Sequence, residues 1–412
     1  MISSHKRLWS LVGCATVAIA TMVLAGPAMS AHKAGPNLVI WTDANRAPAV
    51  TKVANSWAAA NGATVQVVTK DFGSIETAVG TVTAADAPDV ILAAHDWTGQ
   101  LAANGLVEPL YPSNTVKAQF PAYTLNAFSY GTAIKKLYGM PVQVENIGLL
   151  VNTKLAKVPT TFAQLESSAL AWKKKNHLAF GLCVQQGAAG DAYHMYPFFS
   201  GLGGYIFGLN SAGNLDPSNI GVANPKFIKN STLIDKWNKE GLINSKVGYS
   251  DCATAFTTSK TPYWITGPWA DASIEKAGIT FRVVQVPPIT QPSVPFLGVN
   301  GMMVTKWATV HNVDAAAKDL VMNFFSTPSA QTQLAAAGGR APANIKAKSA
   351  DPILAQFGAA GRGGVPMPNI PQMASVWGDL GQAWVRSTKG AGAMPAARSF
   401  RGAAKSIADK IG

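Results

Sequence analysis

The chain has 412 residues, of which 48% are hydrophobic and 13% are charged, and its formal net charge is +13. This apolar content suffices for sizeable cores and excludes a disordered chain, and the length predicts two or three domains. Lys and Arg are spread along the whole chain, without an Arg-rich run, zinc-finger spacing or an aromatic RNA-binding signature. We therefore expect no nucleic-acid partner and interpret the charge as a solvated basic surface.

The N-terminus has the pattern of a secretory signal peptide, assigned to residues 1–30. A short basic stretch precedes an uncharged apolar run over 8–26, and Pro27 with small residues predicts cleavage after Ser30 or Ala31. The alternative is an uncleaved membrane anchor. Cys14 lies inside the apolar run and is interpreted as an ordinary part of it. The pattern predicts a secreted protein, in the periplasm or at the outer face of the cytoplasmic membrane.

Two cysteines remain in the mature chain, Cys183 and Cys252. In an exported protein they can form a disulfide. They can equally be two separate buried thiols, and the sequence leaves both alternatives open.

Strand and helix patterns alternate in the first part of the chain. After a short lead at 32–36, strands are predicted at 37–41, 64–68 and 89–93, and helices at 47–60 and 75–85. This alternation predicts βαβ units on a mainly parallel sheet. Since ligands bind beyond the carboxyl ends of such strands, 42–46 and 94–97 are candidate site segments.

The later elements are more widely spaced. Extended segments or strands are predicted at 136–142, 148–152, 262–265 and 281–286, and helices at 160–176, 226–240, 312–325 and 396–410. Gly338-Gly339 breaks the chain, and 361–364 is predicted to be a mobile loop.

Short motifs at the predicted strand ends combine carboxylates, amides, Arg and aromatic residues. Carboxylates, amides and Arg bond hydroxyl groups, and flat aromatic rings cover the apolar faces of a sugar. The most specific motif is MPNIPQM at 367–373, followed by Trp377. Shorter ones are LVIW at 38–41, AHD at 94–96, PVQVE at 141–145, GGY at 203–205 and TGPW at 266–269.

With these motifs in this order, the chain resembles the maltose-binding proteins, extracellular solute-binding proteins that serve carbohydrate importers. The resemblance implies an α/β, two-lobe periplasmic-binding-protein-like (type II) fold with a hinge and an interlobe cleft. The N-terminal lobe would comprise 36–144 plus 287–344, and the C-terminal lobe 145–286 plus 345–412. The chain would cross between the lobes near Glu145, Val286 and Asn344.

The resemblance also implies roles for polar residues. Asp96 and Glu145 match carboxylates that bond sugar hydroxyls; the alternatives are a helix N-cap for Asp96 and a surface salt bridge for Glu145. Arg46 stands where the family has a contacting Lys, which keeps the charge and changes the geometry. Asn45 and Asp43 neighbour it, and Asp43 is the more direct candidate.

The implied aromatic contacts lie farther along the chain. Trp269 and Trp377 match stacking aromatics, with core packing as the alternative. Tyr193 and Asp191 match a third aromatic and a Glu contact if a short insertion precedes them. Trp97 replaces a family Arg and adds an aromatic surface. Asp43, Arg46 and Asp96 are expected on one lobe, and the later aromatics on the other.

Three departures from the family pattern concern the ligand. Ala93 replaces a bulky aromatic, and Gly378 and Gly381 replace Tyr and Arg contacts, so maltose, trehalose and larger glucans all remain open. The predicted function is capture of a small carbohydrate by hinge closure and delivery to the membrane permease subunits of an ABC importer. We expect a monomer, without catalytic residues, cofactor or metal. The alternatives are a binding protein for a non-sugar solute and a glycoside hydrolase that uses Asp96 and Glu145.

Overall fold

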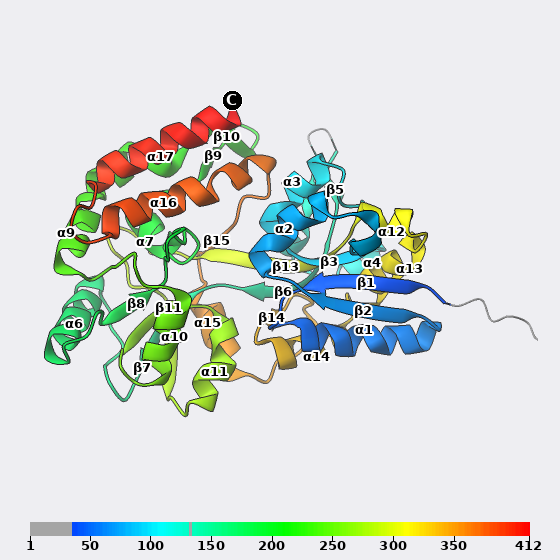
Figure 1. Cartoon of the computed structure of the whole chain (residues 1–412), viewed down its shortest axis with the longest axis horizontal. Coiled ribbons are helices and arrows are strands. Elements are labelled where there is room, and N and C mark those ends of the chain that lie inside the picture. The colour runs from blue at the N-terminus through cyan, green and yellow to red at the C-terminus, as the bar shows by residue number, and fades with distance from the viewer. Residues whose placement is uncertain (1–34, 132–133) are drawn as a thin grey trace, which may run out of the picture. The chain divides into compact units, whose positions relative to one another are not determined.

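The computed structural model describes residues 35–131 and 134–412, which form a mixed α/β fold around two separate sheets (Figure 1). The predicted signal peptide and Cys14 lie outside the described residues. Within the described ranges, no helix combines the length and apolar character needed to cross a membrane. The predicted α/β class with a two-lobe architecture is confirmed.

The first sheet has the strand order β14-β6-β13-β3-β1-β2, with β15 paired to β13. Its strands are β1 (Asn37–Thr42), β2 (Thr64–Thr69), β3 (Val90–Ala94), β6 (Met140–Glu145), β13 (Phe296–Val304), β14 (Ala341–Pro342) and β15 (Val365–Pro366). β1, β2 and β3 are parallel as predicted, but β13 runs antiparallel to β3 and β6. The prediction of a mainly parallel sheet is therefore wrong. The reason is that β13 returns from the second sheet and enters at the carboxyl ends of β3 and β6.

The second sheet has the order β12-β7-β11-β8. Its strands are β7 (Gly148–Asn152), β8 (Leu182–Val184), β11 (Tyr263–Thr266) and β12 (Phe281–Val284). β11 is parallel to β8 and antiparallel to β7. Two hairpins are separate from both sheets: β4 (Ser129–Tyr130) with β5 (Lys136–Leu137), and β9 (Phe207–Leu209) with β10 (Leu215–Ile220).

Helices cover both faces of the first sheet because its strands alternate two sets of apolar side chains. Leu38 and Ile40 point into one core, and Trp41 points into the other. The first core is closed by the longer helices α1 and α14, the second by α2 and α3. The helices of this half are α1 (Ala47–Asn61), α2 (Phe72–Thr81), α3 (Thr98–Ala103), α4 (Asn114–Lys117), α5 (Ala122–Ala127), α12 (Lys306–Val310), α13 (Asp314–Asp319) and α14 (Pro328–Gly338), with short helical turns η1 (Ala84–Asp86), η2 (His95–Trp97) and η5 (Leu320–Phe324).

The second sheet is covered in the same way. Leu149 and Val151 of β7 face a large aromatic core, and Leu150 faces a smaller one on the opposite side. The helices are α6 (Phe162–Lys175), α7 (Tyr196–Gly201), α8 (Pro225–Asn230), α9 (Thr232–Glu240), α10 (Tyr249–Thr257), α11 (Asp271–Lys276), α15 (Pro352–Ala360), α16 (Trp377–Thr388) and α17 (Ala396–Ile411), with turns η3 (Gly221–Ala223), η4 (Pro268–Ala270) and η6 (Pro371–Ser375). α16 and α17 pack on each other (Figure 1).

Most predicted elements are confirmed, and three helices differ in extent. The helix predicted at 75–85 starts at Phe72 and ends at Thr81. The one predicted at 226–240 is interrupted at Ser231, whose hydroxyl donates to the carbonyl of Ile228. The helix predicted at 312–325 starts only at Asp314, because Asn312 has a left-handed φ of 61°.

Apart from the brief pairing of β15 with β13 between α15 and α16, the chain passes between the sheets in three segments: 145–148, 284–296 and 342–352. These lie near the predicted crossings, while the residue limits of the two lobes remain a prediction. Gly298 of β13 pairs with Glu145, and Thr266 of β11 pairs with Gly148 at the start of β7. The carboxyl ends of β6 and β11 therefore both lie beside the same crossing. Residues that follow the strands of either sheet can consequently meet there.

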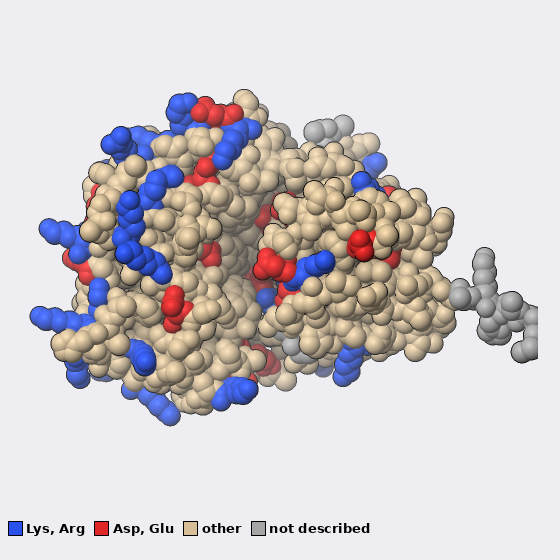
Figure 2. Space-filling model, in the orientation of Figure 1, with Lys and Arg blue, Asp and Glu red and all other residues tan. Residues whose placement is uncertain are grey.

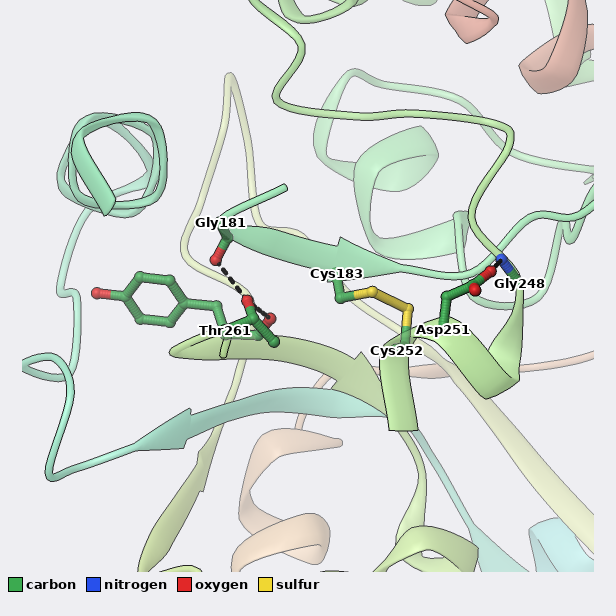
Figure 3. The surroundings of a disulfide bond; sticks show 7 residues. Gly181, Cys183, Gly248, Asp251, Cys252 and Thr261 are labelled. Atoms are coloured by element: carbon green, nitrogen blue, oxygen red, sulfur yellow. Dashed lines mark hydrogen bonds between the residues drawn. A yellow bond between two sulfur atoms is a disulfide. The ribbon is translucent and has the colours of Figure 1, made fainter. Parts of the chain in front are cut away.

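Cys183 and Cys252 form a disulfide, which settles the alternative that the sequence left open (Figure 3). The bond joins β8 to α10 with a Cα–Cα distance of 5.5 Å, across 69 residues of sequence. Beyond it, the amides of Gln186 and Gly187 donate to the carbonyl of Val247 at 2.9 and 3.1 Å. The disulfide and these hydrogen bonds together hold the loop after β8 against the loop before α10.

Candidate functional site

A cavity of about 1300 Å³ lies where the strand ends of the two sheets meet. Figure 2 shows a hollow in the surface with acidic and basic side chains inside it. All ten residues predicted from the sequence line this one cavity: Asp43, Asn45, Arg46, Asp96, Trp97, Glu145, Asp191, Tyr193, Trp269 and Trp377. The structure thus brings the predicted set together, and contact of each residue with a ligand remains a prediction.

Each of these side chains lies at the end of a strand, in the segment that follows a strand, or at the start of a helix. Asp43 and Arg46 follow β1, Asp96 and Trp97 lie in η2 directly after β3, and Glu145 is the last residue of β6. From the second sheet, Asp191 and Tyr193 follow β8, Trp269 lies in η4 after β11, and Trp377 begins α16. Binding sites of open α/β sheets lie at this position, beyond the carboxyl ends of the strands.

Two arginines neutralise two carboxylates at the first-sheet side of the cavity. Arg46 Nε lies 2.5 Å from Asp43 Oδ2, and Arg340 pairs with Glu145. Arg340 also donates from Nη1 to Asn45 Oδ1 at 2.7 Å, and its guanidinium lies 5.6 Å from the ring centre of Trp269. Arg340 therefore contacts predicted residues from both sides of the cavity.

Burial and charge oppose each other in these pairs. Burial alone would raise the pKa of Asp43 and of Glu145, but the adjacent arginines outweigh it and hold both pKa values below the ordinary range. Burial, together with repulsion from Arg340, lowers the pKa of Arg46 to about 10, so Arg46 remains a cation at neutral pH. Its Nη1 is buried without a hydrogen-bond partner among the described residues. That nitrogen can donate to a solute.

Asp96 has a different environment, since no cation among the described residues forms an ion pair with it. It is 7% exposed, and its Oδ2 accepts a hydrogen bond from Trp377 Nε1 at 3.0 Å. Burial raises the pKa of Asp96 to about 6, although the bond from Trp377 opposes this. Its Oδ1 is buried and has no partner within the described part of the chain. A buried acceptor without a partner is costly, so Oδ1 is well suited to accept a solute hydroxyl.

The AHD motif positions Asp96 through its neighbour His95. The amide of Val299 in β13 donates to His95 Nδ1 at 3.1 Å, and His95 Nε2 lies 3.0 Å from the carbonyl oxygen of Met367. Burial lowers the pKa of His95 to about 4, so the ring is neutral, with its proton on Nε2. This ring ties η2 to β13 and to the MPNIPQM segment.

The MPNIPQM segment is an anchor between the two halves. Asn369 Nδ2 donates to the carbonyls of Asn126, Ala127 and Ser129 at 3.0, 2.9 and 3.0 Å. Met373 packs in the core of the second sheet. This motif therefore fixes the backbone that leads into Trp377, and among its residues only Met367 lines the cavity.

The second-sheet side offers a further carboxylate. Asp191 Oδ2 accepts from Gln185 Nε2 at 2.8 Å and lies 2.9 Å from His194 Nδ1. Burial would raise the pKa of Asp191, but His194 and the hydrogen bonds lower it overall. The hydroxyl of Tyr193 is buried and lacks a partner among the residues that the structure covers, and burial raises its pKa far above the usual value.

Aromatic rings form much of the remaining wall. Those lining the cavity are Phe72, Trp97, Tyr193, Tyr249, Trp269 and Trp377. Tyr193 and Trp269 have ring centres 6.3 Å apart, and Phe72 and Trp97 are 4.8 Å apart. Trp269 and Trp377 are only partly buried, which distinguishes them from the fully buried Trp41, Trp237, Trp264 and Trp384 of the cores.

Sequence reasoning missed several residues that line the cavity. They are Thr69, Lys70, Asp71, Phe72, Gly73, Gln185, Ala189, His194, Tyr249 and Arg340. Ala44 and Ala94 also line it and lie in the predicted segments 42–46 and 94–97, and Met367 begins the MPNIPQM motif. Lys70 to Gly73 could have been found, because they follow β2 as Asp43 follows β1. Arg340 had only the preceding Gly338-Gly339 as a signal, which marks the end of a helix and not a site.

Two of the three departures from the family pattern have a structural meaning. Gly190 has a φ of 78°, and a Cβ on it would lie 2.2 Å from the carbonyl oxygen of Gly381. The loop after β8 and helix α16 therefore pack backbone to backbone. This packing also crowds Gly381, where a Cβ would lie 3.1 Å from the carbonyl oxygen of Ala189. A Cβ on Gly378 would meet nothing within 4 Å, so open space replaces a side chain there.

The arrangement suits reversible binding of an uncharged, hydroxyl-rich molecule. Its ionised groups are mostly neutralised in pairs, while side chains with unpartnered donors and acceptors line the same cavity as the aromatic rings. Among residues 35–131 and 134–412, no group of three or more His, Cys, Asp or Glu could hold a metal ion. The site therefore defines a solute-binding protein.

Comparison with known proteins gives the family. The model of the bacterial extracellular solute-binding protein family matches residues 52–356. A galactooligosaccharide-binding protein of Bacillus subtilis is 26% identical over 88% of this chain and 88% of its own length. The maltodextrin-binding protein MdxE of the same organism is 27% identical over 77% and 76%. A maltooligosaccharide ABC transporter solute-binding lipoprotein of Streptococcus pneumoniae is 26% identical over 92% and 91%.

The chain belongs to the bacterial extracellular solute-binding proteins. Its family and its relatives are binding proteins, and the predicted extracellular location agrees with the family.

Proposed function

We propose that this protein binds a small oligosaccharide and delivers it to an ABC importer, without chemical change to the sugar. The observation that carries the proposal is that Asp96, Arg46 and Trp269 line one cavity, and that Asp96 Oδ1 and Arg46 Nη1 have no hydrogen-bond partner among the described residues. Carboxylate and guanidinium groups bond sugar hydroxyls, and indole rings cover the C–H faces of a pyranose. The named ligands of three relatives, galactooligosaccharide, maltodextrin and maltooligosaccharide, support the same class.

Binding is proposed to favour closure of the hinge, because the polar contacts come from both sheets. Asp43, Arg46 and Asp96 lie on the first-sheet side, and Tyr193 and Trp269 lie on the second-sheet side. A solute that touches both sides stabilises the conformation in which they are close. The permease subunits of the importer would recognise that conformation.

The test is a thermal-shift and calorimetric panel of maltose, maltotriose, trehalose and galactooligosaccharides, with a polyamine and a dipeptide as non-sugar probes. A ligand of the folded protein raises the unfolding temperature by mass action. Trp269→Ala should lose most of the shift produced by the best sugar. Trp172→Ala should keep it, because this half-buried indole of α6 is not among the residues that line the cavity. Stabilisation by a non-sugar probe alone would contradict the proposal.

The hydrolase alternative is tested with the same sugars. Incubation with each oligosaccharide, followed by chromatography, should return the sugar intact. If the unsubstituted protein produced shorter sugars and Asp96→Asn did not, the result would support the hydrolase alternative and contradict the proposed transport function.

A further inference from the structure

The positive charge of this protein is concentrated in the half that contains the second sheet. Residues 36–144 and 287–344 contain nine Lys and Arg and nine Asp and Glu. Residues 145–286 and 345–412 contain 22 Lys and Arg and 12 Asp and Glu. The cations are dispersed along the chain, so their segregation emerges only when the fold groups these segments.

Three helices of this half form a basic surface, here called the α8–α9–α17 face. α8, α9 and α17 contact one another. They carry eight exposed cations against three acidic residues, of which Asp235 is half-buried and accepts from the amide of Ala396 at 2.8 Å. The cations are Lys226, Lys229, Lys236, Lys239, Arg398, Arg401, Lys405 and Lys410. Figure 2 shows Lys and Arg side chains gathered over the part of the molecule where Figure 1 places α9 and α16.

The geometry of α17 holds its cations outward. Phe400, Ala403 and Ile407 are buried in the core of the second sheet. Arg398, Arg401 and Lys405, spaced at i, i+3 and i+7, are exposed on the opposite side. Within the described part of the chain, Arg398 and Arg401 form no ion pair, so their charges are available to a partner.

We propose that the α8–α9–α17 face binds the anionic lipid surface of the membrane at which the protein works. The face is a layer of adjacent helices, so its charges extend over a broad area that suits a planar partner. Anionic headgroups attract each Lys or Arg near the surface, and this attraction falls off within a Debye length. The extracellular location of the family places the protein beside such a membrane. This role is independent of which solute the cavity binds.

Sedimentation with lipid vesicles tests the proposal. The full mature protein should bind vesicles of about 30% phosphatidylglycerol in phosphatidylcholine, not pure phosphatidylcholine, and binding should weaken strongly between about 20 and about 300 mM salt. Arg398→Glu/Arg401→Glu/Lys405→Glu should reduce the partition coefficient at least about tenfold. The matched control is Lys52→Glu/Lys117→Glu/Lys136→Glu, the same charge change on exposed residues of the neutral half; it should change binding about twofold or less.

Equal losses of vesicle binding in the two triple variants would overturn the proposal. Such a result would indicate that binding depends on the net charge of the protein and not on the α8–α9–α17 face. Binding to soluble polyphosphate without binding to vesicles would overturn it as well. If the α17 variant does not fold, Lys226→Glu/Lys229→Glu on α8 tests the same face. Circular dichroism and solute affinity, both expected to stay unchanged, separate loss of docking from loss of the solute site.

Discussion

Trp377 and Asp96 are 281 residues apart in the chain, and the indole Nε1 of Trp377 donates a hydrogen bond to Asp96 Oδ2 at 3.0 Å. Trp377 begins α16 on the second-sheet core, and Asp96 lies in η2 after β3 of the first sheet. Asp96 itself lines the cavity, and its other oxygen, Oδ1, has no hydrogen-bond partner among the described residues. Trp377 therefore has two roles in the proposed site: its ring lines the wall, and its edge orients the carboxylate.

Trp377→Phe separates these two roles. Phe keeps an aromatic face but cannot donate to Asp96, so the carboxylate loses its orienting bond. We expect sugar affinity to fall by about tenfold, since hydrogen bonds to charged groups contribute roughly 1.5–3 kcal/mol. Trp377→Ala should lose more, because it also removes the ring. Calorimetric titration of both variants checks this, and equal affinities for Phe and Ala would exclude a contribution from the ring.

The raised pKa of Asp96 predicts that stability depends on pH, and Asp96→Asn should remove this dependence. Burial raises the pKa of Asp96 to about 6 from the ordinary 3.8, so the folded state binds more protons between these values. Stability from this group is therefore full below about pH 4 and declines until about pH 6, by roughly 3 kcal/mol. Asn resembles the protonated form. The variant should thus match the unsubstituted protein near pH 4 and exceed it above pH 6.

Urea unfolding at several pH values measures that difference. Glu76 needs a control, because burial and repulsion from Asp96 raise its pKa to about 7. In a Glu76→Gln background, the proteins with Asp and with Asn at position 96 should still differ in unfolding free energy, and this difference should still depend on pH. A difference that is constant from pH 4 to 7 would contradict the assignment to Asp96.

Arg340→Ala should impair both stability and binding. It leaves Glu145 as an unpaired buried charge and removes the bond to Asn45. Breaking a buried pair from one side costs about 3–5 kcal/mol. Arg340→Lys should recover part of this, since Lys keeps the charge without the guanidinium fork. Lys318→Ala, which breaks the solvent-accessible pair with Asp314, should cost about 0.5 kcal/mol or less and serves as the control in chemical denaturation.

Reduction of the Cys183–Cys252 disulfide should weaken sugar binding as well as stability. The bond holds the loop that carries Gln185 against the start of α10, where Tyr249 lines the cavity. Loss of a native disulfide typically costs about 2–5 kcal/mol. We expect the Cys183→Ala/Cys252→Ala variant to unfold at lower urea and to bind several-fold more weakly. Unchanged affinity would show that the loops keep their positions without the bond.

The sequence predicted the site better than the sheets around it. Strand ends are marked by a change from buried apolar to polar residues, so segments such as 42–46 and 94–97 could be located without the fold. β13 was not predicted as a strand, since its glycines and methionines, with Asn300 among them, lack the β-branched pattern. Its antiparallel entry depends on where the chain returns, which no local pattern encodes.

Arg340 and Tyr249 were missed for a related reason. Each reaches the cavity through contacts with residues far away in sequence: Arg340 through Glu145, and Tyr249 through the loops that the disulfide joins. The cysteine pairing likewise remained open, because spacing alone does not specify which thiols are neighbours. The charge segregation behind the α8–α9–α17 face was also hidden, since an even distribution along the chain says nothing about its distribution in space.

The central place of β13 constrains the order in which this protein can be completed during synthesis. β13 lies between β3 and β6, so the first sheet lacks a central strand until residue 304 has been synthesised. By then every strand of the second sheet has already emerged. The N-terminal half therefore cannot complete its central sheet until the strands of the second sheet have been made.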